Sequence, residues 1–523
     1  MRSLDDWSDI LEAASETDLC VTLPSDKPVS VESLKRFVRA ARRDGDGDGN
    51  RNLTHLFLSP HGPVDYSDSG CATCYTEGGY LAKMMRRAGY DERGYDENGH
   101  DEDGYNENGE MRAPDPPVPL GKEDVVDLSR EGLSTRELRI LMLVSELCPR
   151  MKGLNISHNS FPFDTSWDCV MAHGSLAEAC PPHSPIFSTL QELNLENCNI
   201  DGRTASSLFR CLRPFPRGFR PCGPIALRTL YLSNNPIGDK GFEALLGGGG
   251  NPILPLLDGL HLSNCNISDA SMDILVDSLD PYEDNIDMPQ GKIIDLSNNQ
   301  LSSRGATFLG QAIGFINEND DGERVTMTVK VPLLAKLNLS GNSLDCHAVQ
   351  YVFERLAMRQ SNQYNNRALP QARQRYCLPS PILFLDLSRT SCGVEGVCQF
   401  LQASEKWDMP IHVSFANNNI GPEGSPRFED VFDETKAGRR LRHFDISGNP
   451  FLGAETAYNI LRCLRFDLLE LQETDGEADD NVGEREITLI LGAVDATSGR
   501  AKLEEELRLL RESFPNCRVV LTL

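Results

Sequence analysis

The 523-residue sequence contains no run of 18 apolar residues and so offers no candidate transmembrane helix. Its first residues, MRSLDDWSDILEAASETD, lack the basic and apolar regions of a signal peptide. Basic residues are few, with 51 Lys and Arg against 78 Asp and Glu, and the formal charge is −27. This excess of acid argues against nucleic acid or a membrane surface as the partner. We therefore expect a soluble, intracellular, cytoplasmic protein, with association with the cytoskeleton as an open alternative.

Sixteen cysteines are too few for a disulfide scaffold of this length. Most lie among apolar residues and are expected to be reduced, buried thiols. One cluster, made of Cys169, His173, Cys180 and His183, offers zinc-ligand types within one short segment. The same segment also fits an amphipathic helix, and such spacings recur by accident. We predict no metal site, and zinc binding by this cluster stays open.

A repeated frame, L-x-x-L-x-L-x-x-N/C-x-L, runs through the middle of the sequence. Its clearest copies are LQELNLENCNI at 190–200, LRTLYLSNNPI at 227–237, LDGLHLSNCNI at 257–267, LAKLNLSGNSL at 334–344 and LRHFDISGNPF at 441–451. Looser copies begin at residues 123, 151, 291, 382 and 410. The apolar fourth and sixth positions alternate with polar ones, which predicts a strand with one buried face. The Asn or Cys at the ninth position is expected to bond to the backbone of its own and the neighbouring repeat.

Each frame is followed by an apolar pattern with helical spacing, as in SDASMDILVDSL at 268–279. One strand and one helix per unit resemble the ribonuclease-inhibitor-like subfamily of leucine-rich repeat proteins, which includes Ran GTPase-activating proteins and the repeats of NOD-like receptors. The resemblance covers 123–464. It implies an α/β solenoid: a leucine-rich repeat horseshoe with a parallel concave β-sheet and convex α-helices.

The same pattern gives a domain plan for one elongated array of about thirteen units. We expect an N-terminal cap and irregular repeats at 1–122, with an acidic insertion at about 89–119. Regular repeats with rim insertions follow at 123–465. An irregular repeat and a cap occupy 466–523, with an acidic loop at about 473–486, a helix at 502–514 and a strand at 517–523.

Extra length between repeats falls after the helix and before the next strand, which places the insertions on one rim. The insertion at 314–333 is expected to be a loop. The insertion at 359–379 contains Arg359, Arg367, Arg373 and Arg375 with two tyrosines and no acid. Arginine beside aromatic residues is typical of protein interfaces and of sites for single-stranded nucleic acid. The global charge favours a protein partner, and a solvated loop stays open.

The third and fifth frame positions are expected to point onto the concave face. The predicted partner-binding set at these positions is Tyr231, His261, Asp295, Lys336, Phe384, Asp386, His412, His443 and Asp445. Aromatic and His side chains among carboxylates indicate a protein-binding groove. A variable surface that serves only solubility is the alternative.

The sequence contains no nucleophile elbow, zincin helix, kinase motif set or dinucleotide fingerprint. We therefore predict no catalytic residues, no cofactor and no small-molecule substrate. The favoured function is a non-enzymatic scaffold or adaptor that binds a protein of unknown identity. The resemblance implies one alternative, a Ran-type GTPase-activating protein, and a cytoskeletal or flagellar assembly component is another.

Overall fold

The computed structural model describes residues 18–22 and 55–59 and, with gaps, residues 120–522; the longest gaps in this last stretch are 168–189, 213–225, 279–291, 366–383 and 475–485. Several predictions lie outside the described residues: the zinc cluster, Arg367, Arg373, Arg375, the acidic insertion at 89–119 and most of the loop at 473–486. The chain divides into two compact units, Met1–Leu260 and His261–Leu523. Each unit is described by itself.

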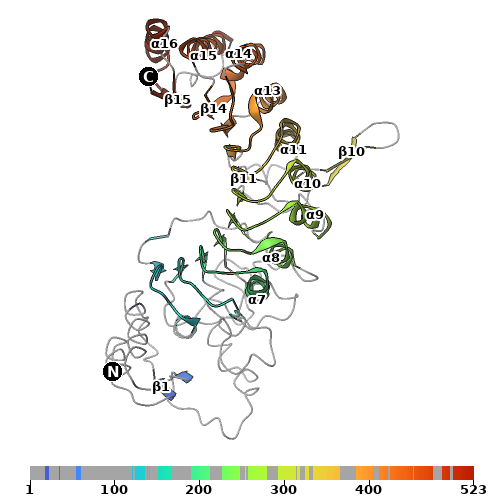
Figure 1. The fold of residues 1–523 in the computed structure, drawn as a ribbon, viewed down its shortest axis with the longest axis vertical. Coiled ribbons are helices and arrows are strands. Elements are labelled where there is room, and N and C mark those ends of the chain that lie inside the picture. The colour runs from blue at the N-terminus through green and yellow to red at the C-terminus, as the bar shows by residue number, and fades with distance from the viewer. Residues whose placement is uncertain are drawn as a thin grey trace, which may run out of the picture. The chain divides into compact units, whose positions relative to one another are not determined.

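In the first unit, four short strands pair in parallel in the order of the sequence. Each residue of a strand lies opposite the residue at the same frame position in the next strand. They are β3 (Val125–Asp127), β4 (Gly153–Asn155), β5 (Glu192–Asn194) and β6 (Thr229–Tyr231). Helices α7 (Gly202–Leu212) and α8 (Gly238–Leu245) pack against each other beside them (Figure 1). Strands β1 (Asp18–Thr22) and β2 (His55–Ser59) form a parallel pair, as a separate two-stranded sheet.

In the second unit, the strands again follow chain order and pair in parallel. They are β8 (Lys292–Asp295), β11 (Leu334–Asn338), β12 (Phe384–Asp386), β13 (Ile411–Ser414), β14 (Leu441–Asp445), β15 (Ile487–Ala493) and β16 (Cys517–Thr522), while β7 (Gly259–His261) spans the boundary of the units. The helices are α9 (Asp269–Ser278), α10 (Ser303–Ile313), α11 (Cys346–Asn365), α13 (Gly393–Ser404), α14 (Ser425–Glu434), α15 (Ala454–Thr474) and α16 (Arg500–Ser513), with the short 3-10 helix η6 (Ala437–Arg439). Each α-helix packs on the next and lies on one side of the strands (Figure 1). This alternation confirms the α/β solenoid.

The core consists of the fourth and sixth frame positions. The eight leucines at these positions in the clearest copies are at most 2% exposed: Leu193, Leu195, Leu230, Leu232, Leu260, Leu262, Leu337 and Leu339. Burial of a leucine side chain is worth about 1.5–3 kcal/mol, so each repeat is stabilised by covering its neighbour's leucines. The register expected from the frame is confirmed.

The ninth-position asparagines form the expected ladder. Asn235 Oδ1 accepts hydrogen bonds from the backbone N–H groups of Cys198 (2.9 Å) and Ile200 (3.0 Å) in the preceding repeat. Its Nδ2 donates to the carbonyl oxygens of Leu195 and Leu232, both at 2.8 Å. The same arrangement recurs at Asn299, Asn342, Asn418 and Asn449. These side chains form hydrogen bonds with buried backbone groups in the turns, where no strand pairing or helix supplies a partner.

Two insertions differ from the expected loops. Residues 314–333 contain an antiparallel hairpin, β9 (Phe315–Glu318) with β10 (Arg324–Thr328). An Asp-Gly pair at 321–322 between β-prone residues was the signal for it. Helix α11 runs to Asn365, so Arg359 lies in a helix and not in a rim loop. No Pro or Gly occurs from 347 until Pro370, so nothing in the sequence stops the helix earlier.

Candidate protein-binding face

The described helices of the second unit all lie on one side of its strands, and the opposite face of the sheet is the candidate binding face (Figure 1). Residues Lys336, Phe384, His412 and His443 occupy the third frame position on β11 to β14 and lie in register with one another. We call these four the third-position row. Residues Asn338, Asp386, Ser414 and Asp445 are likewise in register and form the fifth-position row. Both rows lie on the face of the sheet opposite the buried leucines. On that face Lys336 is exposed, Ser414 is buried, and the other six side chains are half-buried.

The third-position row forms one cluster. Phe384 and His443 lie on strands separated by β13, which are roughly 10 Å apart at two strand spacings. Their ring centroids are nevertheless only 5.5 Å apart, so the two rings lean toward each other across β13. Lys336 places its Nζ 5.3 Å from the centroid of the Phe384 ring, within the range of a cation–π contact.

His412 lies on β13 between these two rings. Its ring is nearly parallel to that of His443, at a centroid distance of 6.5 Å and an interplanar angle of 3°. The Nε2 atom of His412 is buried and has no hydrogen-bond partner among the described residues. Burial, together with the charges of His443 and Arg442, lowers the pKa of His412 to about 4. The imidazole is therefore neutral at pH 7, and its buried Nε2 atom makes no hydrogen bond within the described part of the chain.

The aspartates of the fifth position have a local role that the sequence interpretation missed. Asp295, Asp386 and Asp445 each accept a hydrogen bond, at 2.9–3.0 Å, from the backbone N–H two residues further on. The same bond occurs at Asp127, Asn155, Asn194 and Asn338. One oxygen of each side chain thus holds the turn that leaves the strand. The signal was present in the sequence, since seven of ten frames have Asp or Asn at this position.

The remaining oxygen of Asp445 is part of a small polar network. Its Oδ2 accepts a hydrogen bond from Ser414 Oγ at 3.3 Å, and Ser414 Oγ lies 2.8 Å from Ser388 Oγ. A partner would therefore meet the fifth-position row as amide and carboxylate groups beside the rings, because the Ser414 side chain is buried.

Tyr231 and His261 break the fifth-position pattern, because neither side chain is Asp or Asn. Tyr231 belongs to the first unit and is half-buried. Burial raises the pKa of its hydroxyl, and the charge of Glu192 raises it further. His261 is the first residue of the second unit and is also half-buried. Asp295 lies on β8, the strand that pairs with β11. Of the nine predicted residues, six thus lie on β11 to β14, and Asp295 lies on the adjacent strand.

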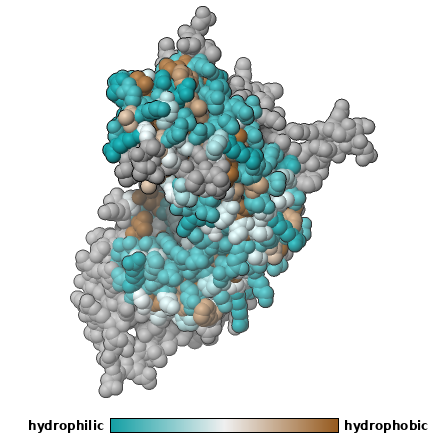
Figure 2. All heavy atoms as spheres, turned by 45° about the horizontal axis from the view of Figure 1, so that its top comes forward, coloured by the Kyte–Doolittle hydropathy of each residue, from teal (hydrophilic) through white to brown (hydrophobic). Residues whose placement is uncertain are grey.

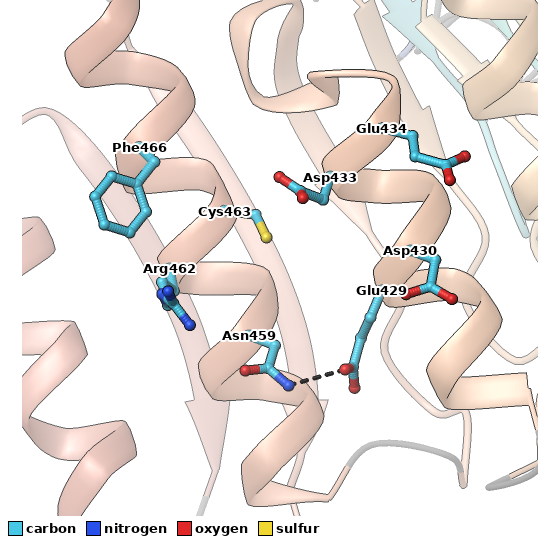
Figure 3. Close-up of a pocket in the computed structure, with 8 residues that line it drawn as sticks. All are labelled: Glu429, Asp430, Asp433, Glu434, Asn459, Arg462, Cys463 and Phe466. Atoms are coloured by element: carbon cyan, nitrogen blue, oxygen red, sulfur yellow. Dashed lines mark hydrogen bonds between the residues drawn. The ribbon is translucent and has the colours of Figure 1, made fainter.

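A pocket of about 360 Å³ lies elsewhere, between helices α14 and α15 (Figure 3). Its lining is Glu429, Asp430, Asp433, Glu434, Asn459, Arg462, Cys463 and Phe466. Asn459 Nδ2 donates to Glu429 Oε2 at 2.8 Å, so one carboxylate is used within the protein. The guanidinium carbons of Arg462 and Arg465 lie 5.6 and 4.8 Å from the centroid of the exposed Phe466 ring. The two arginines therefore already make the cation–π contacts that this ring could offer to a cationic ligand.

The described residues offer little nucleophilic or metal chemistry. Burial raises the pKa of the Cys463 thiol to about 11, with the charges of Asp433 and Asp467 as further causes. Burial likewise raises the pKa of Cys392 and Cys398 to about 11, so these thiols are protonated at neutral pH. No group of three or more His, Cys, Asp or Glu side chains in the described part of the chain is placed to hold a metal ion. None of the described helices is both long and apolar enough to cross a membrane.

The comparisons with known proteins agree with this fold. Family models described as leucine-rich repeat match residues 189–211 and 226–246. The ribonuclease inhibitor of Sus scrofa is 32% identical over 124 residues, which are 24% of this chain and 24% of that protein. The chain thus matches about a quarter of the length of that relative. The strand–helix units and these matches show that the chain contains leucine-rich repeats, and part of the chain is similar to a ribonuclease inhibitor.

Proposed function

We propose that this protein is a non-enzymatic scaffold that binds a protein partner through the third-position row. The single observation that carries the proposal is the cluster of Lys336, Phe384, His412 and His443, drawn from four neighbouring strands. Leucine-rich repeat proteins typically bind proteins, and solenoids do so through extended surfaces of this kind.

The cluster has the composition of a contact site. Among the coloured residues visible in Figure 2, hydrophobic ones lie in separate patches among mainly hydrophilic ones. A half-buried phenyl ring beside a lysine supplies apolar area and charge together, which is typical of interface hot spots.

A scaffold needs no reactive group, and the raised pKa values of the Cys392, Cys398 and Cys463 thiols fit this role. The relative named a ribonuclease inhibitor suggests one partner to test first, a ribonuclease. Because the similarity covers only 24% of each chain, ribonuclease binding is an assay for this chain and not an assignment.

The test compares two Phe→Ala variants. Phe384→Ala removes the ring from the proposed site, whereas Phe466→Ala removes a ring that is 45% exposed on helix α15. Partners captured from native cells with the parent chain are purified, and their affinities for the three proteins are measured. We expect Phe384→Ala to weaken binding about tenfold or more and Phe466→Ala to leave it unchanged. Equal affinity of Phe384→Ala and the parent would exclude this site.

A further inference from the structure

Among the described strands, β16 lies at one edge of the sheet. In the described part of the chain it pairs with β15 and with no other strand. It has six residues, whereas β8 and β11 to β14 have three to five. Natural edges are usually blunted by shortness, Pro or Lys, and the sequence CRVVLT has only Arg518 as a charged residue.

The direction of the backbone groups follows from one bond. The backbone N–H of Ile487 donates to the carbonyl oxygen of Asn516 at 3.3 Å. Since alternate residues of a parallel strand bond to opposite neighbours, Arg518 and Val520 turn their backbone groups toward β15. Val519 and Leu521 turn theirs toward the outer edge. Their N–H and C=O groups form a template for another strand.

The charge at this end of the chain permits a second copy to approach. Residues 500–523 contain five basic and four acidic residues, a net charge of +1 in a chain of −27. On α16, Arg508 pairs with both Glu505 and Glu512, so exposed charges of both signs lie beside β16. Two strongly acidic chains repel each other over most of their surface, and this balanced segment avoids that repulsion.

We propose that two copies of this chain associate by antiparallel pairing of their β16 strands about a twofold axis at Val520. Val519 of each copy then lies opposite the second copy's Leu521, which gives four main-chain hydrogen bonds. The two Val520 side chains, each 37% exposed in the single chain, meet across the axis as a non-hydrogen-bonded pair. Arg518 lies opposite the second copy's Thr522, so no like charges meet.

The twofold axis is perpendicular to the sheet and leaves both α16 helices on the same side. Within one chain, α15 and α16 already pack beside sequential strands β14, β15 and β16 of the same sheet. A strand pair and a helix contact bury less area than a standard stable interface, so the dimer is weak and depends on concentration.

Sedimentation of the 523-residue chain across concentrations tests the proposal. The mass is expected to rise from 57.9 kDa toward twice that value. Val520→Lys places two ammonium groups opposite each other and should raise the dissociation constant at least tenfold. Ile293→Lys is the matched control, because Ile293 is 36% exposed on β8 inside the same sheet, and it should leave the dimer intact. Unchanged melting temperatures show that both variants fold.

Hydrogen exchange supplies the second measurement. Exchange at the β16 peptide should slow as the parent associates, and Val520→Lys should abolish that protection. A parent chain that stays at 57.9 kDa up to its solubility limit overturns the proposal, even if β16 binds a strand of another protein. A dimer that survives Val520→Lys with β16 unprotected also overturns it, because the copies then meet elsewhere.

Discussion

The third-position and fifth-position rows lie side by side on β11 to β14, yet their side chains make different contacts. At the fifth position, Asp or Asn recurs and makes the same local hydrogen bond in seven frames. At the third position the residues vary, and Phe384 and His443 contact each other across a strand. A polar residue that repeats on a solenoid surface therefore indicates local structure, whereas one that departs from the repeat is the better candidate for binding.

The largest expected effect concerns a repeated, buried position. Asn418→Ala removes the acceptor of the Thr390 N–H (2.9 Å) and the donor to the Leu387 carbonyl (2.8 Å). Two buried backbone groups without partners should lower the free energy of unfolding by about 2–4 kcal/mol in urea denaturation. Lys336→Ala, at an exposed third position, is the control and should change it by less than about 0.5 kcal/mol. Similar losses in both variants would remove the distinction between repeated and variable positions.

The second effect is a pH dependence that arises from His412. Its pKa is about 4 in the folded protein, below its ordinary value of 6.5, so the unfolded chain binds more protons between these pH values. The free energy of unfolding should therefore fall as pH decreases from 6.5 to 4, by about 2 kcal/mol after allowance for partial exposure. His412→Gln should flatten this part of the profile, as measured by urea denaturation at several pH values.

Asp467 should change the free energy of unfolding with pH in the opposite direction to His412. Burial raises its pKa to about 6 from 3.8, against the backbone N–H of Gly438 and the charges of Lys436 and Arg439. The folded protein then holds more protons in this range, so this group's contribution to stability falls as pH rises from 3.8 to 6. Asp467→Asn keeps an acceptor for Gly438 N–H and should make the profile steeper, with greater loss at low pH. If the same profile were seen in this variant and in His412→Gln, neither group would be the source.

A smaller effect is expected at the fifth position. Asp386→Ala removes the acceptor of the Ser388 N–H (3.0 Å) and should cost about 1 kcal/mol of unfolding free energy. Asp386→Asn keeps that acceptor and should be nearly neutral in the same denaturation experiment. If both variants lose partner affinity as strongly as Phe384→Ala, the fifth-position row also belongs to the binding site.

The smallest effect concerns the arginine-rich segment. Replacing Arg359, Arg367, Arg373 and Arg375 by Gln should slow association with an acidic partner severalfold and reduce its salt dependence, without a change in melting temperature. Stopped-flow association at two salt concentrations measures this. An unchanged association rate would leave these arginines without a role in binding.

Much of the fold could be predicted because the signals are local and repeated. The alternation of leucines determines which face of each strand is buried, as Leu337 and Leu339 show. The helix at 502–514 and the strand at 517–523 correspond to α16 and β16. The hairpin at 315–328 and the length of α11 were missed where the repeat signal stops and local turn chemistry decides. The domain boundaries at 122 and 465 stay predictions.

The sequence by itself determined the repeat, the buried leucines and the asparagine ladder, because each depends on spacing within one frame and its neighbour. Only the tertiary structure decided that Phe384 and His443 lean together, that His412 lies between them with a buried Nε2, and that β16 lies at one edge of the described strands. These features depend on the lateral register of strands whose paired positions are 28 residues apart from β12 to β13 and 31 residues apart from β13 to β14. The packing of neighbouring repeats sets that register, and no single frame contains it.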